Sequence, residues 1–81
     1  MMNELAQAYR LGWEDAAQHA KKGWAPLLHE WYATYRLMEE GISVTVDTVD
    51  AYIHAYRACA RYEQRAQEIV RAELAGTAAA R

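Results

Sequence analysis

The most regular polar feature of the sequence is a series of arginines at Arg57, Arg61 and Arg65, with Arg71 a little off the line. Side chains four residues apart lie on one face of an α-helix, so these arginines would form a basic ridge. The planar guanidinium fork matches both carboxylates and phosphates. The ridge therefore indicates either a solvated helix face or a binding site for an acidic protein surface or a phosphate.

A block of acidic residues complements the ridge: Glu39, Glu40, Asp47 and Asp50, with no lysine or arginine between them. A molecule with one acidic and one basic patch is dipolar and could pair head to tail with a second copy or dock a basic partner. The block predicts a partner-binding acidic patch. The alternative is that loops around helix ends are often acidic without a special function.

Catalytic and metal-binding patterns have little support. His29-Glu30 lacks the second histidine of the HExxH zinc motif, and the three histidines fall on three different expected helices. A zinc site needs about four ligands in register. The sequence has no glycine-rich phosphate loop and no recognisable nucleophile and base, and Cys59 falls among apolar positions. We therefore expect no enzyme, no metal and no cofactor, and a core position for Cys59.

Composition narrows the class of protein further. The 81 residues are enough for one domain, and 53% of them are hydrophobic, which is typical of a folded chain. The net charge of -2 argues against a general binder of polyanions. A single cysteine favours a reducing, cytoplasmic location, and no apolar run approaches the roughly 20 residues of a membrane span.

Apolar periodicity predicts an all-α fold, a three-helix bundle with a long C-terminal helix. We expect helices at about 3–22, 26–40 and 48–74 within a single domain of residues 1–75, followed by a tail of residues 76–81. The inward stripe of the first helix would hold Leu5, Tyr9, Gly12, Ala16 and Ala20. That of the second helix would hold Leu27, Leu28, Trp31, Tyr32, Tyr35 and Met38.

The positions that end and join the helices are also predicted. Gly12, flanked by Ala8 and Ala16, would let another helix approach closely, whereas Gly23 would end the first helix. Residues 42–46 alternate like a strand but have no partner strand, so we expect an extended connector, with Asp47 capping the third helix and Gly76 ending it.

The third helix is expected to extend beyond the ends of the other two. Its apolar arc continues beyond the length of the second helix, with Glu63 and Gln67 in the middle of the arc. This pattern predicts a projecting segment, and a homodimer formed through it. Leu11 and Leu37 break the pattern differently, because they project from the polar faces of the first and second helices. With Trp24 and Tyr32 they would form an apolar contact patch.

Residues 9–16, Tyr-Arg-Leu-Gly-Trp-Glu-Asp-Ala, resemble the Tyr-x-x-Gly-Trp/Tyr-x-x-Ala run of many small proteins encoded by phages and mobile elements, and that of the ribosome modulation factor family. The ribosome-associated family is strongly basic, and this chain is not. Small phage proteins of this kind include anti-CRISPR and other anti-defence inhibitors, which act by covering a surface of a host protein. The resemblance implies that class of action and assigns no residues.

The sequence thus leads to two hypotheses. The first is a non-enzymatic protein-binding module that inhibits or modulates a host protein complex. The second is a nucleic-acid- or ribosome-associated factor that uses the arginine ridge, with Lys21 and Lys22.

Overall fold

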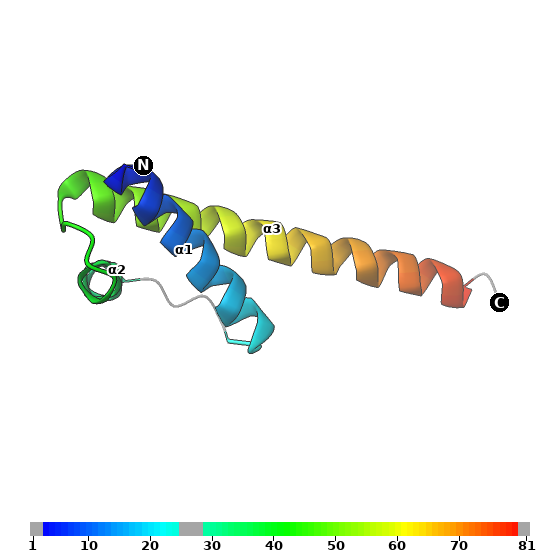
Figure 1. Ribbon diagram of the computed structural model, residues 1–81. Helices are drawn as coiled ribbons and strands as arrows, with labels where there is room; N and C mark the ends of the chain where they lie inside the picture. The colour runs from blue at the N-terminus through cyan, green and yellow to red at the C-terminus, as the bar shows by residue number, and fades with distance from the viewer. Residues whose placement is uncertain (1–2, 25–28, 80–81) are drawn as a thin grey trace.

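Three α-helices make up the computed structural model, which describes residues 3–24 and 29–79, with side chains as far as residue 76 (Figure 1). They are α1 (Glu4–Lys21), α2 (Glu30–Glu39) and α3 (Val46–Ala79), and no strand occurs within the described ranges. α1 packs along the first half of α3, and α2 lies at the same end of the molecule. The predicted all-α fold with a long C-terminal helix is confirmed.

Local residues determine where α1 begins and where α1 and α2 end. The side chain of Asn3 caps α1 by accepting a hydrogen bond from the backbone N–H of Ala6 at 2.8 Å. Gly23 and Gly41 adopt φ values of 74° and 70°, in the left-handed region that only glycine enters at little cost, and they follow α1 and α2. The stop predicted at Gly23 is therefore confirmed. Pro26 and its neighbours lie outside the described residues.

The start of α3 differs from the prediction. Asp47 is not the cap, because the helix begins at Val46 and Asp47 lies in its first turn. Thr45 and Thr48 bond reciprocally instead: Thr45 Oγ1 accepts from the backbone N–H of Thr48 at 3.1 Å, and Thr48 Oγ1 accepts from that of Thr45 at 2.9 Å. A threonine pair thus satisfies the free N–H groups, and the carboxylate at Asp47 is left exposed near the positive end of the helix.

The end of α3 differs as well. The helix passes through Gly76, where it was expected to stop, and continues to Ala79. One glycine within a helix costs only about 1 kcal/mol relative to alanine, and its neighbours in this segment are mainly alanines, which favour the helix. The predicted tail is therefore helical over most of its length.

Gly12 lies at the closest approach of α1 to α3. A Cβ at this position would overlap the backbone carbonyl oxygen of Tyr52 and would lie 3.0 Å from its carbonyl carbon. Ala8 and Ala16, one turn away on either side, are buried in the same interface. The predicted close contact at Gly12 is confirmed, and it allows the two backbones to touch.

The core is small and rich in tyrosine. Its largest fully buried side chains are Tyr52, Tyr56, Leu37 and Cys59, three of them from α3. Burial raises the pKa of the Cys59 thiol, as expected of a thiol that packs in the core. The core position predicted for Cys59 is confirmed.

The inward faces of α1 and α2 are rotated from those expected. Leu11 and Leu37 were expected to project from polar faces, but both are buried. Leu11 and Ile42 of the connector belong to the same core cluster and border the same shallow depression. Leu5 and Tyr9, expected to face inward, are exposed.

On α2 the inward side chains are Ala33 and Leu37, whereas Trp31, Tyr35 and Met38 are 68%, 54% and 67% exposed. The small Ala33 allows a close approach that the bulky aromatic face would prevent. Leu27 and Leu28 lie outside the described residues.

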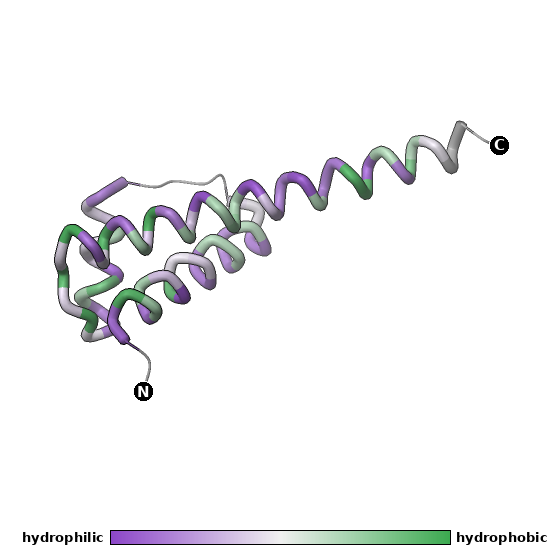
Figure 2. Tube along the Cα trace, turned by 90° about the horizontal axis from the view of Figure 1, so that it is seen from above, coloured by the Kyte–Doolittle hydropathy of each residue, from purple (hydrophilic) through white to green (hydrophobic). Residues whose placement is uncertain are grey.

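The second half of α3 projects beyond the bundle, as predicted (Figures 1 and 2). Most side chains of residues 61–76 are exposed, and the molecule measures 55 × 24 × 16 Å. We call residues 61–76 the overhang. Among the described residues, no helix has the length and apolar content needed to cross a membrane.

Candidate binding surfaces

A polar network joins the three helices at the base of α2. Arg36 donates two hydrogen bonds to the carboxylate of Asp15 on α1, at 2.8 and 3.1 Å, and Tyr52 Oη on α3 donates to the same carboxylate at 2.6 Å. Arg36 also reaches Glu39 at 2.8 Å and Glu40 at 3.3 Å. One guanidinium therefore holds three carboxylates and fixes α2 against α1.

The pKa shifts follow from this geometry. Hydrogen bonding to Asp15 raises the pKa of Arg36 further above its usual range, so that it stays charged. Burial, together with the hydrogen bond to Asp15, raises the pKa of Tyr52 well above 10.0. The network is stable as an ion pair with a neutral phenol, and we assign it a structural role.

Sequence reasoning did not identify Asp15 and Arg36. One signal was available: Arg36 stands three and four residues before Glu39 and Glu40, where a single helix face brings them together. This contact also explains two acidic residues at the carboxyl end of a helix, where the dipole disfavours them.

His19 forms a second junction, at the carboxyl end of α1. Its Nδ1 lies 2.5 Å from Tyr56 Oη and its Nε2 lies 3.3 Å from Tyr32 Oη, so that one imidazole bridges α2 and α3. The ring of Trp24 lies 5.2 Å from that of His19 and carries Lys22 Nζ over its face at 4.6 Å. The predicted apolar contact patch comprised Leu11, Trp24, Tyr32 and Leu37. Trp24 is exposed and Tyr32 half-buried, whereas Leu11 and Leu37 are buried.

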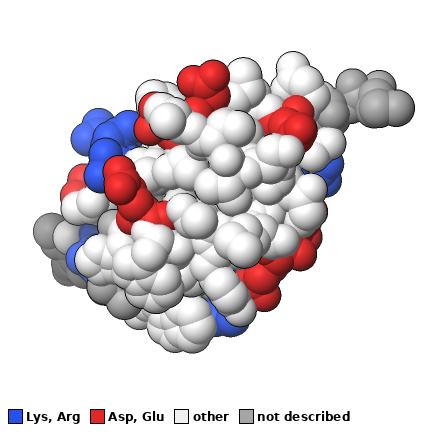
Figure 3. Space-filling model, turned by 90° about the vertical axis from the view of Figure 1, so that its left-hand side faces the viewer, with Lys and Arg blue, Asp and Glu red and all other residues white. Residues whose placement is uncertain are grey.

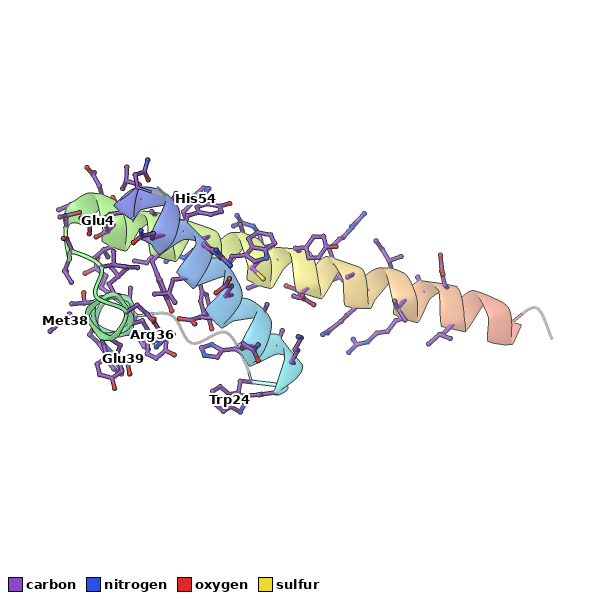
Figure 4. The ribbon with its side chains drawn as sticks, in the orientation of Figure 1. Glu4, Trp24, Arg36, Met38, Glu39 and His54 are labelled. Carbon is purple, nitrogen blue, oxygen red and sulfur yellow. The ribbon has the colours of Figure 1, made fainter. Side chains whose placement is uncertain are left out.

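Three large apolar side chains of α2 are exposed together. We call Trp31, Tyr35 and Met38 the aromatic face; they lie three to four residues apart, on the side of α2 opposite Ala33. The His29 ring stacks on Trp31 with an interplanar angle of 8°. Figure 3 shows this end of the molecule as a broad uncharged area with charged side chains at its edges, and Met38 points outward in Figure 4.

The predicted acidic patch is divided by the fold. Glu39 and Glu40 are engaged by Arg36, whereas Asp47 and Asp50 lie exposed on the first turns of α3. Two of the four acidic residues therefore already contact a cation within the chain, although the single charge of Arg36 is shared among three carboxylates.

The basic ridge is exposed as a whole. Arg57, Arg61, Arg65 and Arg71 are all accessible, and none makes an ion pair with another residue that the structure describes. The imidazole ring of His54, near the ridge, lies 6.2 Å from the ring of Tyr9, measured between centroids. The ridge thus has charge available for a ligand.

A groove opens where α1 diverges from α3. Its volume is about 430 Å³. One wall comes from His19 at the end of α1 and from Trp24 just after it, and the other from Ala60, Glu63 and Gln67 of α3. Glu63 and Gln67, the two polar residues within the apolar arc, thus border an open space at the base of the overhang. Within the described residues, no group of three or more histidine, cysteine or acidic side chains is arranged to hold a metal ion.

Comparison with protein-family models, with curated proteins and with solved structures finds no match to this chain.

Proposed function

We propose that this chain is a non-enzymatic protein-binding module whose main contact is the aromatic face of α2. The observation that carries the proposal is the exposure of Trp31, Tyr35 and Met38 on a helix that turns only Ala33 and Leu37 fully inward. Tryptophan and tyrosine are enriched at binding hot spots, and methionine is enriched at interfaces generally. An apolar face of this kind costs solubility unless a partner covers it.

Two anchors fasten this face to the rest of the fold. Burial of Leu37 and the two hydrogen bonds from Arg36 to Asp15 hold α2 in one orientation, so a partner would lose little conformational entropy in ordering it. Glu30 and Glu39 flank the face on α2. We therefore propose a partner with an apolar groove and a basic rim.

The resemblance of residues 9–16 to small phage proteins suggests a specific form of this function. We propose an inhibitor or modulator of a host protein complex, of the anti-defence type, that acts by covering a surface of its target. This form needs no catalytic group.

The test is affinity capture from the native host with three proteins: the wild type, the double variant Trp31→Ser/Tyr35→Ser, and the control Tyr62→Ser. Tyr62 is as exposed as the aromatic face but lies on the overhang. A partner of the aromatic face should be captured by the wild type and the control and lost with the double variant. Titration calorimetry with the purified partner should then show a loss of affinity of about tenfold or more for each single aromatic substitution. Equal capture by all three proteins would refute the proposal.

A second function is supported by the basic ridge. Arg57, Arg61 and Arg65 are exposed and have no ion-pair partner among the described residues, as a phosphate-binding helix would require. The test is fluorescence anisotropy with labelled double-stranded DNA and structured RNA. Binding at 50 mM salt that falls by more than about tenfold at 200 mM, and that is lost in Arg61→Gln/Arg65→Gln, would favour this function. Absence of binding at the lower salt concentration would eliminate it.

A further inference from the structure

The outer face of α3 carries acids in its first turns and bases farther along. Counted at 100° per residue, Asp47, Asp50, Arg61 and Arg65 all lie within about 60° of the direction opposite Cys59, which faces the core. All four side chains are exposed, and none makes an ion pair with another residue that the structure describes. This outer face is therefore open, and its two halves carry opposite charge.

The charges are arranged symmetrically about position 56. Asp47 and Arg65 each lie nine residues from it, and both lie about 60° to the same side of the middle of the face. Asp50 and Arg61 lie six and five residues from it, close to the middle of the face. An identical helix turned end over end thus presents a base opposite each of these acids, to within about 1.5 Å along the axis.

We propose that the outer face binds a second copy of this chain, with the two α3 helices antiparallel about a two-fold axis beside position 56. Such an axis brings the same side of each face together. Asp47 then meets Arg65 of the second copy, and Asp50 meets Arg61 of the second copy. The symmetry forms each pair twice in the dimer, and the guanidinium fork of arginine suits a carboxylate partner.

The charges select both the direction and the occupant. In a parallel pair each residue lies opposite its own copy, so Asp50 would meet Asp50 and Arg61 would meet Arg61, which is repulsive. A phosphate backbone is negative throughout and matches only the half of the face that carries arginines. A reversed second copy matches both halves.

Two charges of the outer face stay outside this pairing. Arg57 lies one residue from the axis, beside its own copy and opposite His54. Glu68 lies opposite position 44, before the second helix begins. The antiparallel arrangement therefore contains four attractive pairs and one pair of like charges among the α3 residues of this face.

The first experiment is a charge exchange measured by sedimentation equilibrium at about 20 mM salt, where screening is weak. The wild type should form dimers, and Asp50→Arg and Arg61→Asp should each raise the dimer dissociation constant by about tenfold or more, because two attractive pairs become repulsive. The double variant Asp50→Arg/Arg61→Asp restores opposite charges and should return to within about threefold of the wild type. Because both positions are exposed, circular dichroism should show equal helix content in all four proteins.

Arg71→Asp is the matched control. It changes the net charge as Arg61→Asp does, but Arg71 lies opposite position 41, before the second helix begins, so the dissociation constant should change by less than about threefold. Raising the salt to about 300 mM should weaken the wild-type dimer by about tenfold or more, because exposed ion pairs are screened.

Four results would overturn the proposal. The first is a wild type that remains monomeric up to about 1 mM at the lower salt concentration. The second is a double variant as weak as its single parents. The third is a control as weak as Arg61→Asp, which would indicate an effect of net charge alone. The fourth is a dimer that salt does not weaken, which would indicate an apolar contact.

Cysteine cross-linking tests the register independently, in a Cys59→Ala background. Position 57 lies next to the axis, so Arg57→Cys should give a covalent dimer on mild oxidation. Arg65→Cys should not, because the two copies of position 65 are about 27 Å apart along the helices. A parallel pair would cross-link at both positions. That result, or no cross-link at position 57, would overturn the proposal.

The dimer is independent of the proposed functions. Neither the aromatic face of α2 nor a nucleic acid enters these measurements, so a failure of the dimer would leave both proposed functions standing.

Discussion

Replacement of Gly12 by alanine tests the contact that holds α1 against α3. The added Cβ would overlap the backbone carbonyl of Tyr52 and lie 3.1 Å from its Cα. These are backbone atoms of a helix whose Tyr52 side chain is fully buried, so no side-chain rotation relieves the contact. An ordinary contact distance of about 3.5 Å requires the helices to separate by roughly 1 Å.

The magnitude follows from two opposing terms. Alanine gains about 1 kcal/mol over glycine in the middle of a helix. Overpacking of a core costs about 1–3 kcal/mol, and a clash with backbone belongs at the upper end of that range. We therefore expect a net loss of about 2 kcal/mol in the free energy of unfolding, or about 8–16 °C in Tm for a domain of this size.

The assay is urea and thermal denaturation followed by circular dichroism at 222 nm, with Gly76→Ala as the matched control. Gly76 is also helical, has no positive φ and has no atom within 4 Å of its would-be Cβ. The same substitution there should be neutral or stabilising by up to about 1 kcal/mol. A Gly12→Ala protein as stable as the wild type would refute the close contact. Gly12→Leu should prevent folding altogether.

Three further predictions concern the core and its polar network. Leu37→Ala should lower the free energy of unfolding by about 2–5 kcal/mol because it opens a cavity, whereas Met38→Ala should change it by less than about 0.5 kcal/mol. Urea denaturation measures both changes. Equal losses would contradict the burial of Leu37 and the exposure of Met38. Arg36→Met should cost about 3 kcal/mol because it strands the carboxylate of Asp15, whose side chain is only 12% exposed. A double-mutant cycle with Asp15→Asn should recover part of that loss, and full additivity would contradict the pairing. Because the folded-state pKa of Tyr52 is raised above 10.0, its contribution to stability is present below pH 10 and declines as the pH rises beyond it. Denaturation between pH 9 and 11 should therefore show a smaller loss of stability with pH for Tyr52→Phe than for the wild type. An equal loss in both proteins would show that Tyr52 is not its source.

The sequence was informative at several positions where one residue type decides the local structure, although the cap predicted at Asp47 and the stop predicted at Gly76 were wrong. Gly23 adopts a positive φ after the first helix, and Gly12 is small enough for two backbones to touch. Residues 42–46, after Gly41, alternate like a strand but had no second strand to pair with, so a connector was predicted there. These are properties of single residues and their immediate neighbours, and they can be predicted without knowing the rest of the fold.

The candidate surfaces could be predicted only in part. The spacing of Arg57, Arg61 and Arg65 predicted one shared helix face, and the structure shows that this face is exposed. Leu11 and Leu37 were placed on the wrong side. The error has a common cause. A helical wheel gives the direction of the most apolar arc, but it does not show which arc has a neighbour.

By itself, the sequence determined three helices, their order, the close contact at Gly12 and the projection of α3. The tertiary structure decided which side of α2 is buried. The narrow side with Ala33 and Leu37 fits against the core, and Arg36 must face Asp15, whose partly buried carboxylate needs a cation. That requirement turns Trp31, Tyr35 and Met38 outward. The exposure of the aromatic face therefore follows from the ion pair between Arg36 of α2 and Asp15 of α1. The sequence of α2 alone could not predict that pair.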